Sequence, residues 1–221
     1  MTLATDLDAM RRAFMTKVPT EIREAMRRAD SSLLASGIVE GALKTGDIVP
    51  DFALPDVNGE TVSLTDLLKS GPIVVSFYRG GWCPYCNLEL RALQSVLPQI
   101  IRLGATLVAI SPQSPDGSLT TSEKNELAFP VLSDDGSSVA KAFGIAFDLA
   151  EELRPIYTRL NDPLPAMNGT DSWMLPIPAT YVIGQNGVIA LAYVDVDYRK
   201  RLEPTVVVDA LRRLSGLLAW P

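Results

Sequence analysis

Histidine is absent from this chain of 221 residues, and cysteine occurs only twice, as Cys83 and Cys86. Without histidine, neither a Ser-His-Asp nor a Cys-His catalytic arrangement can form, and imidazole metal sites are excluded. Two thiols supply only half the ligands of a thiolate zinc site. A disulfide between residues three apart would constrain the unfolded chain very little. A chemical role for the two thiols is therefore favoured over a structural one.

Positive charge and long apolar runs are also scarce. Twenty lysines and arginines stand against 26 acidic residues, which gives a net charge of −6, whereas a nucleic-acid-binding protein needs a basic face. No run of 18 apolar residues occurs, so no membrane-spanning helix is expected. The first residues carry Asp6 and Asp8 and lack the apolar core of a secretory signal, which predicts a cytoplasmic protein.

Two apolar stripes at helical spacing predict two helices within residues 1–40. The first comprises Leu3, Leu7, Met10 and Phe14, and the second comprises Ile22, Met26, Ala29 and Leu33. Pro19 separates the stripes, and Gly37 is suited to end the second helix. We expect this segment to be an extension that packs on the domain formed by residues 41–221, or that contacts a second copy in a homodimer.

Residues 41–221 predict a mixed α/β domain. The runs Ile73–Tyr78 and Thr106–Ser111 are typical of strands buried on both faces, and the helix between them completes a right-handed parallel βαβ unit. Further strands are expected at residues 129–132, 180–183 and 188–194. The proline-rich stretch 145–177 predicts one helix near residues 149–160 and then an irregular loop. A closing helix is expected over residues 203–218, with Val206, Ala210, Leu211 and Leu214 facing inward.

The clearest chemical signal is the run Trp82-Cys83-Pro84-Tyr85-Cys86, which follows a buried strand and opens a helix. The free amide groups and the positive dipole end of a helix N-terminus stabilise a thiolate there. They lower the pKa of a thiol below its free value of about 8.5. At C-x-x-C spacing, one sulfur can then resolve an adduct on the other as a disulfide. The pair predicts redox chemistry that requires neither a metal nor an organic cofactor.

Other polar residues are expected at the same edge of the sheet. The strand near residue 180 should run antiparallel to the first two, so Pro178 at its start lies beside the thiols. The following strand returns to that edge and leads into the charged run 195–201. This run is either a solvated loop or the source of a positive charge, from Arg199 or Arg201, for a thiolate or a substrate.

Three further segments carry a family resemblance: Gly46–Leu54 with Asn58-Gly59, Phe129–Asp134 with Val139–Gly144, and Ala179–Ile183 with Asn186-Gly187. Together they resemble the peroxiredoxin-like alkyl hydroperoxide reductase / thiol-specific antioxidant family of the thioredoxin-fold superfamily, over roughly residues 46–215. The resemblance implies a thioredoxin-like fold, in which helices flank a mixed central sheet, here with an N-terminal helical extension. It also implies the reduction of hydroperoxides by cysteine.

The chain departs from that family around the thiols. In the family pattern a proline and then a threonine or serine precede the peroxidatic cysteine. By this register Cys86 takes the peroxidatic position, while Arg79 and Cys83 occupy the other two. Pro178 replaces the family arginine before the late strand, and it resembles the cis-proline of thioredoxin. Trp82-Cys83 also resembles thioredoxin, and Cys-Pro-Tyr-Cys is the motif of dithiol glutaredoxins.

Three functions remain open, with peroxide reduction as the leading hypothesis. As a peroxidase, Cys86 would attack the peroxide and Cys83 would condense with the resulting sulfenic acid. As a disulfide oxidoreductase, Cys83 would attack a substrate disulfide and Cys86 would resolve it. The third function is a redox-sensing module without turnover.

Three structural features should separate these functions. Buried thiols of ordinary acidity would favour the redox-sensing module. An Arg199 or Arg201 that reaches Cys86 would favour the peroxidase. A cis Pro178 with an apolar groove beside Trp82 and Tyr85 would favour disulfide exchange. Thioredoxin, glutaredoxin or glutathione is the expected electron donor, and Arg79, Arg199 or Arg201 could pair with the carboxylates of glutathione.

Overall fold

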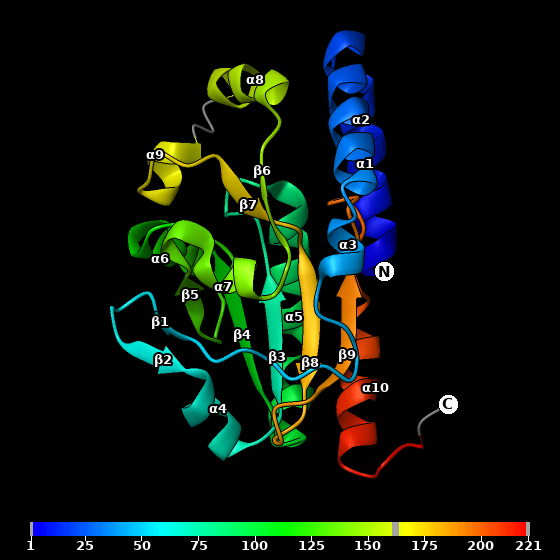
Figure 1. Cartoon of the computed structure of the whole chain (residues 1–221). Coiled ribbons are helices and arrows are strands. Elements are labelled where there is room, and N and C mark those ends of the chain that lie inside the picture. The colour runs from blue at the N-terminus through cyan, green and yellow to red at the C-terminus, as the bar shows by residue number, and fades with distance from the viewer. Residues whose placement is uncertain (1, 161–163, 220–221) are drawn as a thin grey trace.

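The structure is a computed structural model, and it describes residues 2–160 and 164–219. A five-stranded sheet in the order β5-β4-β3-β8-β9 forms its centre (Figure 1). Strands β3, β4 and β5 are parallel, and β8 and β9 are antiparallel to their neighbours. The bounds are β3 (Ile73–Phe77), β4 (Thr106–Ser111), β5 (Val131–Ser133), β8 (Ala179–Ile183) and β9 (Ile189–Val194). The predicted βαβ unit and the antiparallel late strand are both confirmed.

The apolar runs of the central strands form these strands because both faces of the sheet are covered. Every residue of β3 is buried. Val74 faces one core, whereas Ile73 and Val75 face the other, as the alternation of side chains along a strand requires. The sheet therefore presents its carboxyl edge, and not its faces, for chemistry.

One face of the sheet is covered by three helices, α1 (Leu3–Lys17), α5 (Pro84–Arg102) and α10 (Pro204–Leu214). The prediction for the closing helix was partly wrong. Val206 is exposed, and Val207 and Val208 take the inward positions. The helix also ends at Leu214, before the exposed Leu217 and Leu218. Burial of an apolar face therefore does not stabilise the helix beyond Leu214.

Shorter elements cover the other face. They are α3 (Ile38–Gly41), β1 (Ala53–Pro55), β2 (Thr61–Ser63), α4 (Leu64–Ser70), η1 (Asp135–Ser137) and α7 (Ser138–Ala142), whereas α6 (Pro115–Lys124) lies beside α5, to which its C-cap Asn125 is hydrogen-bonded. Phe77, Phe143 and Tyr181 pack edge-to-face in this core, with ring centroids 4.8–6.1 Å apart. This aromatic contact holds β3 and β8 against the helical layer beneath the site.

The two helices predicted for the N-terminal segment are α1 and α2 (Thr20–Ala35), which together are called the N-terminal arm. Leu3 and Leu7 of α1 are buried in the core against α5, and Ala25 of α2 is buried in a small separate core. The arm therefore packs on its own chain, as one of the two alternatives predicted. The domain boundary at residue 40, which α3 crosses, and the homodimer remain predictions.

Residues 146–176 form an excursion from the sheet edge, where the sequence predicted one helix and a loop. β6 (Ala146–Asp148) and β7 (Met174–Pro176) pair antiparallel at its base. Between them lie η2 (Glu151–Leu153), α8 (Arg154–Arg159) and α9 (Leu164–Asn168), and part of the predicted loop falls outside the described residues. The helix predicted near residues 149–160 is present as η2 followed by α8, with Pro155 in the first turn of α8. The predicted loop contains α9, because Leu164 and Leu175 are buried in the small core.

Within the described residues, no helix has the length and apolar character needed to cross a membrane.

Candidate active site

Cys83 stands where a buried strand turns into a helix. β3 ends at Phe77, and Cys83 is the N-cap of α5, with Pro84 in the first turn as predicted. Gly80 permits the turn between them. Its φ is +148°, and a Cβ there would lie 2.2 Å from the indole nitrogen of Trp82. The turn therefore delivers Cys83 to the amino end of a 19-residue helix.

The two cysteines are free thiols, and both are buried. Burial raises the pKa of Cys83, but a hydrogen bond from Cys86 and the charges of Arg79 and Arg201 outweigh it and lower the pKa to about 6. Burial and the adjoining Cys83 thiolate hold the pKa of Cys86 well above its usual value. The arrangement stabilises a thiolate at Cys83 and a protonated thiol at Cys86.

Arg201 reaches Cys86, which is the contact that we expected to favour the peroxidase. Its Nη2 lies 3.5 Å from the Cys86 sulfur, and its Nε donates to Glu89 at 2.6 Å. Both side chains of this ion pair are at least 98% buried, and Thr180 also donates to Glu89. Burial raises the pKa of Glu89 to about 7, against the opposing effect of Arg201. The cation beside Cys86 is therefore balanced by a carboxylate.

Arg199, the other candidate, does not reach the thiols. It pairs with Asp30 of α2 at 2.9 Å and with Asp197 at 2.5 Å, and its side chain is 20% exposed. Arg199 thus fastens the loop after β9 to the N-terminal arm.

Arg79 is held in a cage of aromatic rings. Its guanidinium carbon lies 4.3 Å from the ring centroid of Tyr198, 5.0 Å from that of Trp82 and 5.7 Å from that of Tyr157. It donates a hydrogen bond to the Tyr157 hydroxyl, and its buried Nε has no hydrogen-bond partner among the described residues. Within this part of the chain it forms no ion pair. Arg79 is thus a buried cation packed on neutral rings, and the nearby Asp30 is bonded to Arg199 instead.

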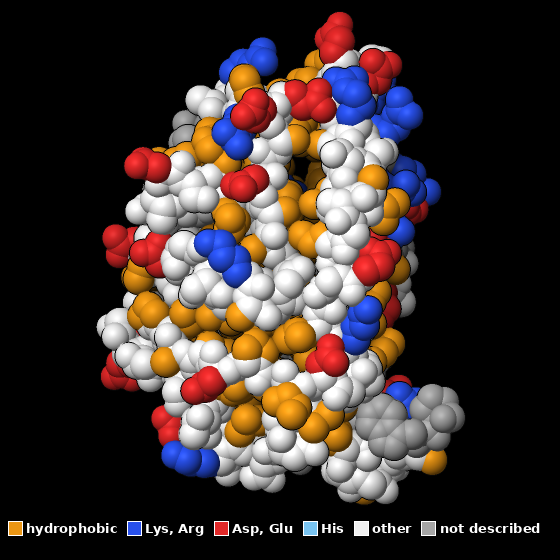
Figure 2. Space-filling model, viewed as in Figure 1, with side chains coloured by type: hydrophobic (Ala, Val, Ile, Leu, Met, Phe, Trp, Pro, Cys, Tyr) orange, Lys and Arg blue, Asp and Glu red, His pale blue; other side chains and the backbone are white. Residues whose placement is uncertain are grey.

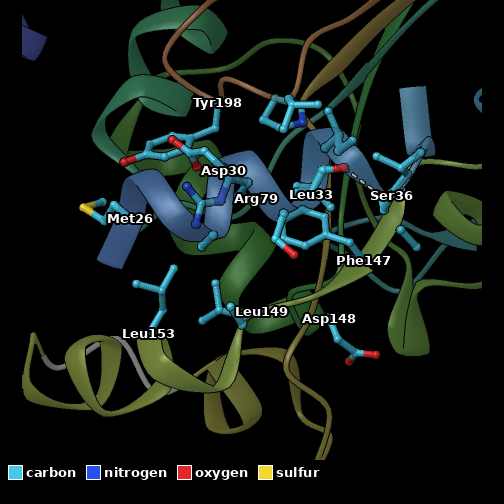
Figure 3. Close-up of a pocket in the computed structure, with 18 of the residues that line it drawn as sticks. Met26, Asp30, Leu33, Ser36, Arg79, Phe147, Asp148, Leu149, Leu153 and Tyr198 are labelled. Carbon is cyan, nitrogen blue, oxygen red and sulfur yellow. Dashed lines mark hydrogen bonds between the residues drawn. The ribbon is translucent and has the colours of Figure 1, made fainter. Parts of the chain in front are cut away.

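Pro178 lies near Arg79 but not in the expected conformation. The Ile177–Pro178 peptide bond is trans, so the condition of a cis Pro178 that would favour disulfide exchange is not met. The chain is extended here, because Ile177 donates to the backbone of Ile145 before the chain enters β8 directly. Pro178 lines a cavity of about 430 Å³. Figure 3 shows the Arg79 guanidinium in this cavity among Met26, Asp30 and Tyr198.

A second cavity, here called the arm pocket, lies against Cys83 and has a volume of about 450 Å³. Its walls come from three places. The site supplies Arg79, Trp82, Cys83, Pro84, Tyr85 and Tyr198; the arm supplies Phe14, Lys17, Val18, Pro19, Ile22 and Met26; and residues 153–160 supply Leu153, Ile156, Tyr157 and Leu160. In Figure 2 the surface is hollowed between the arm and the rest of the molecule, with hydrophobic side chains around the opening.

The structure brings together most of the predicted site residues. Cys83, Cys86, Trp82, Tyr85, Arg79 and Arg201 form one cluster, Pro178 borders it, and Arg199 lies outside it. Sequence reasoning missed Glu89, Tyr157 and the arm residues of the pocket. An acidic side chain three residues after Cys86, on an inward helix face, was a usable signal for Glu89. Tyr157 had no local signal.

Comparisons with known proteins give one consistent family. A model described as the AhpC/TSA family matches residues 45–192. "Peroxiredoxin Q, chloroplastic" of Triticum aestivum is 31% identical over 167 residues, 76% of this chain and 64% of that protein. "Peroxiredoxin Bcp" of Escherichia coli K12 is 35% identical over 103 residues, 47% of this chain and 65% of that protein. The matches thus span slightly less than two thirds of each of these two relatives.

Solved structures give the same fold. Peroxidoxin BcpB of Mycobacterium tuberculosis superposes with a TM-score of 0.62 at 24% identity, covering 80% of this chain and 99% of that one. Peroxiredoxin Q of Xanthomonas campestris superposes with a TM-score of 0.55 at 20% identity, covering 73% and 89%. The mixed sheet flanked by helices is therefore the thioredoxin-like fold. The N-terminal arm precedes the segment that the family model matches.

Proposed function

This chain belongs to the AhpC/TSA family, and on that premise we propose that it is a thiol peroxidase that reduces hydroperoxides with Cys83 and Cys86. The single observation that carries the proposal is the pair of free, buried thiols at the start of α5, with a guanidinium 3.5 Å from Cys86. The family and the relatives named peroxiredoxin supply the peroxide as the oxidant.

The reaction proceeds in two steps on the protein. One thiolate attacks a peroxide oxygen, the O–O bond breaks, and the sulfur becomes a sulfenic acid while the alcohol or water leaves. The second thiol then attacks this sulfur, which forms the Cys83–Cys86 disulfide and releases water. Cys83 is the N-cap of α5 and Cys86 lies in its first turn, so the disulfide can form without unfolding of the helix.

An external thiol then returns the disulfide to two thiols. We propose a dithiol protein of the thioredoxin or glutaredoxin type as this donor. Glutathione is less favoured because Arg201 and Arg199, two of the three arginines considered for its carboxylates, already form ion pairs. The homodimer and the cytoplasmic location remain predictions, since the similar proteins include a bacterial one and others whose names place them in chloroplasts.

Disulfide exchange is the second candidate. It is favoured by the low pKa of Cys83 at a helix N-cap and by the apolar arm pocket beside Trp82 and Tyr85. The trans Pro178 removes the other feature that the sequence offered for it.

The proposed function is tested with fully reduced protein and one equivalent of hydrogen peroxide or cumene hydroperoxide. We expect loss of the mass of two hydrogens, a change in Trp82 fluorescence and a rate far above that of free cysteine. A rate no faster than free cysteine with both peroxides would contradict the peroxidase. A rapid reaction with a protein disulfide would then support the second candidate.

A further inference from the structure

We propose that Cys83, and not Cys86, attacks the peroxide, and that this peroxide is an organic one whose apolar group occupies the arm pocket. The inference rests on the proposed function and reverses the order of the sulfurs that the family register implies. It is carried by one juxtaposition, in which Cys83, the caged Arg79 and the apolar walls of the arm meet at a single cavity.

Access distinguishes the two sulfurs. Cys83 lines the arm pocket, and Cys86 is not among its lining residues. Both cysteines are almost fully buried, with Cys83 1% and Cys86 0% exposed, and the buried pair Arg201–Glu89 lies against Cys86. A peroxide must bring an oxygen to the attacked sulfur in line with its O–O bond. A peroxide bound in the arm pocket can approach Cys83 in this way, because Cys83 lines the pocket.

Charge distinguishes them in the same direction. The cation beside Cys86 is paired with Glu89, whereas Arg79 packs on aromatic rings and one hydroxyl and forms no ion pair among the described residues, since the nearby Asp30 is bonded to Arg199. A buried cation without an anion is costly, and a thiolate at Cys83 supplies that anion. Cys83 also caps α5, where the helix dipole favours negative charge. The lowered pKa of Cys83 and the raised pKa of Cys86 agree with this assignment.

The chemistry balances with Cys83 as the attacking group. The Cys83 thiolate donates an electron pair to the terminal oxygen of R–O–O–H, and the O–O bond breaks. The sulfur becomes sulfenic acid, and RO⁻ leaves and takes a proton from solvent to give ROH. Arg79 lines this cavity, so its guanidinium can stabilise the leaving RO⁻. Cys86 then attacks the Cys83 sulfur, and its proton leaves with the displaced hydroxide as water.

The pocket walls indicate the class of R group. About 450 Å³ lies in the range of small-ligand pockets, and the arm side is formed by Phe14, Ile22 and Met26 among others. Such walls stabilise a ligand by removing its apolar carbon surface from water. An aryl or branched alkyl group has such a surface, and hydrogen peroxide has none. Because the arm precedes residue 45, these walls are an addition to the family segment.

The order of the sulfurs is tested with Cys83→Ser and Cys86→Ser variants and one equivalent of cumene hydroperoxide. Serine at position 86 can still donate a hydrogen bond to Cys83, so the first step should survive. We expect Cys86→Ser to release one equivalent of alcohol at a rate within about threefold of wild type. It should hold a sulfenic acid on Cys83 that dimedone traps. Cys83→Ser should react at least 100-fold more slowly.

A sulfenic acid on Cys86 in Cys83→Ser, formed at the wild-type rate, would overturn the proposal, and so would loss of the fast phase in Cys86→Ser. Near-ultraviolet circular dichroism checks that both variants are folded before their rates are compared. A wild-type protein that reacts with neither peroxide would contradict the proposed function itself.

The substrate class is tested with Ile22→Asn, which places an amide in the pocket wall. Rates for cumene hydroperoxide and hydrogen peroxide are each divided by the rate of free cysteine thiolate. We expect the wild type to favour cumene hydroperoxide, and Ile22→Asn to lower kcat/KM for it by about tenfold with little change for hydrogen peroxide. Leu34→Asn, an exposed position of α2 that does not line the pocket, is the matched control. An unchanged ratio of the two rates in Ile22→Asn, or a wild-type preference for hydrogen peroxide, would overturn this part.

Discussion

Cys83 and Cys86 lie one helical turn apart, yet the molecule surrounds them in opposite ways. Cys83 borders an apolar cavity and the buried cation Arg79, which forms no ion pair among the described residues. Cys86 is enclosed, and the cation beside it is bound to Glu89. The difference shows how two identical side chains acquire different roles. A neighbouring cation without an ion pair and contact with a cavity favour attack by Cys83. A neighbouring cation that is already paired, together with full burial, keeps Cys86 protonated until Cys83 has been oxidised.

Replacing Arg201 with methionine should have the largest effect, and it should be on stability. The change removes the hydrogen bonds of Arg201 to Glu89 and to the backbone of Tyr198 and Lys200. Breaking a buried pair by removing one partner costs about 3 kcal/mol or more. Urea unfolding at pH 8 measures this loss. A stability within 1 kcal/mol of wild type would show that the pair beside Cys86 is not the compensated unit described.

The same variant should show a pH dependence. Glu89 has a folded pKa raised to about 7 from a usual value of 4.5, so its contribution to stability falls as pH rises through that range. In wild type this loss ends near pH 7. Without Arg201 the pKa of Glu89 rises further, so the loss continues and the penalty of Arg201→Met is larger at pH 8 than at pH 6. An equal penalty at both pH values would contradict the assignment.

Replacing Arg79 with methionine should act on rate instead of stability. Arg79 is one of the groups that lower the pKa of Cys83 to about 6, after the hydrogen bond from Cys86, so its removal should reduce the thiolate fraction at pH 7, by at most about 30-fold if the free value of about 8.5 is reached. Peroxide reduction should slow by up to that factor, whereas stability should change little because the Cys83 thiol takes up a proton once its cation is gone. Arg212→Met, which affects only an exposed pair with Asp209, is the control. A 30-fold loss in Arg201→Met but not in Arg79→Met would reverse the comparison.

The fast phase of the wild-type reaction should follow the thiolate of Cys83. Its rate constant should be nearly constant above pH 7 and should fall about tenfold per pH unit below pH 6, because the thiol form does not attack. Stopped-flow fluorescence between pH 4.5 and 8 tests this. A midpoint above pH 8 would point to Cys86 as the attacking sulfur.

Arg199→Met should have the smallest effect. Its ion pairs with Asp30 and Asp197 are partly exposed, and such pairs contribute about 1 kcal/mol or less. Stability should fall by no more than that, and the rate with hydrogen peroxide should change less than twofold. A tenfold loss of rate would place Arg199 in the site, where the structure does not put it.

More of the fold than of the site could be predicted from the sequence. Runs such as Ile73–Phe77 identify buried strands because β-branched side chains on both faces leave no alternative, and the turn at Cys83 follows from them. The strand directions also indicated that the charged run 195–201 lies at the same edge of the sheet as the thiols, and Arg201 of this run contacts Cys86. Contacts between distant segments were not predictable, because Tyr157 meets Arg79 only through the packing of residues 146–176. The resemblance of Pro178 to the thioredoxin cis-proline was uninformative for a related reason, since it carried no information on the β6–β7 pairing that precedes this residue.

The account depends most directly on which sulfur carries the negative charge. The ultraviolet absorbance of the thiolate, followed against pH in Cys86→Ser and in Cys83→Ser, measures each sulfur alone. We expect the thiol of Cys86→Ser to titrate near pH 6 and that of Cys83→Ser above the free value of about 8.5. If the Cys83→Ser protein titrates near pH 6 and the Cys86→Ser protein above 8.5, Cys86 is the nucleophile and the account of the two environments is wrong.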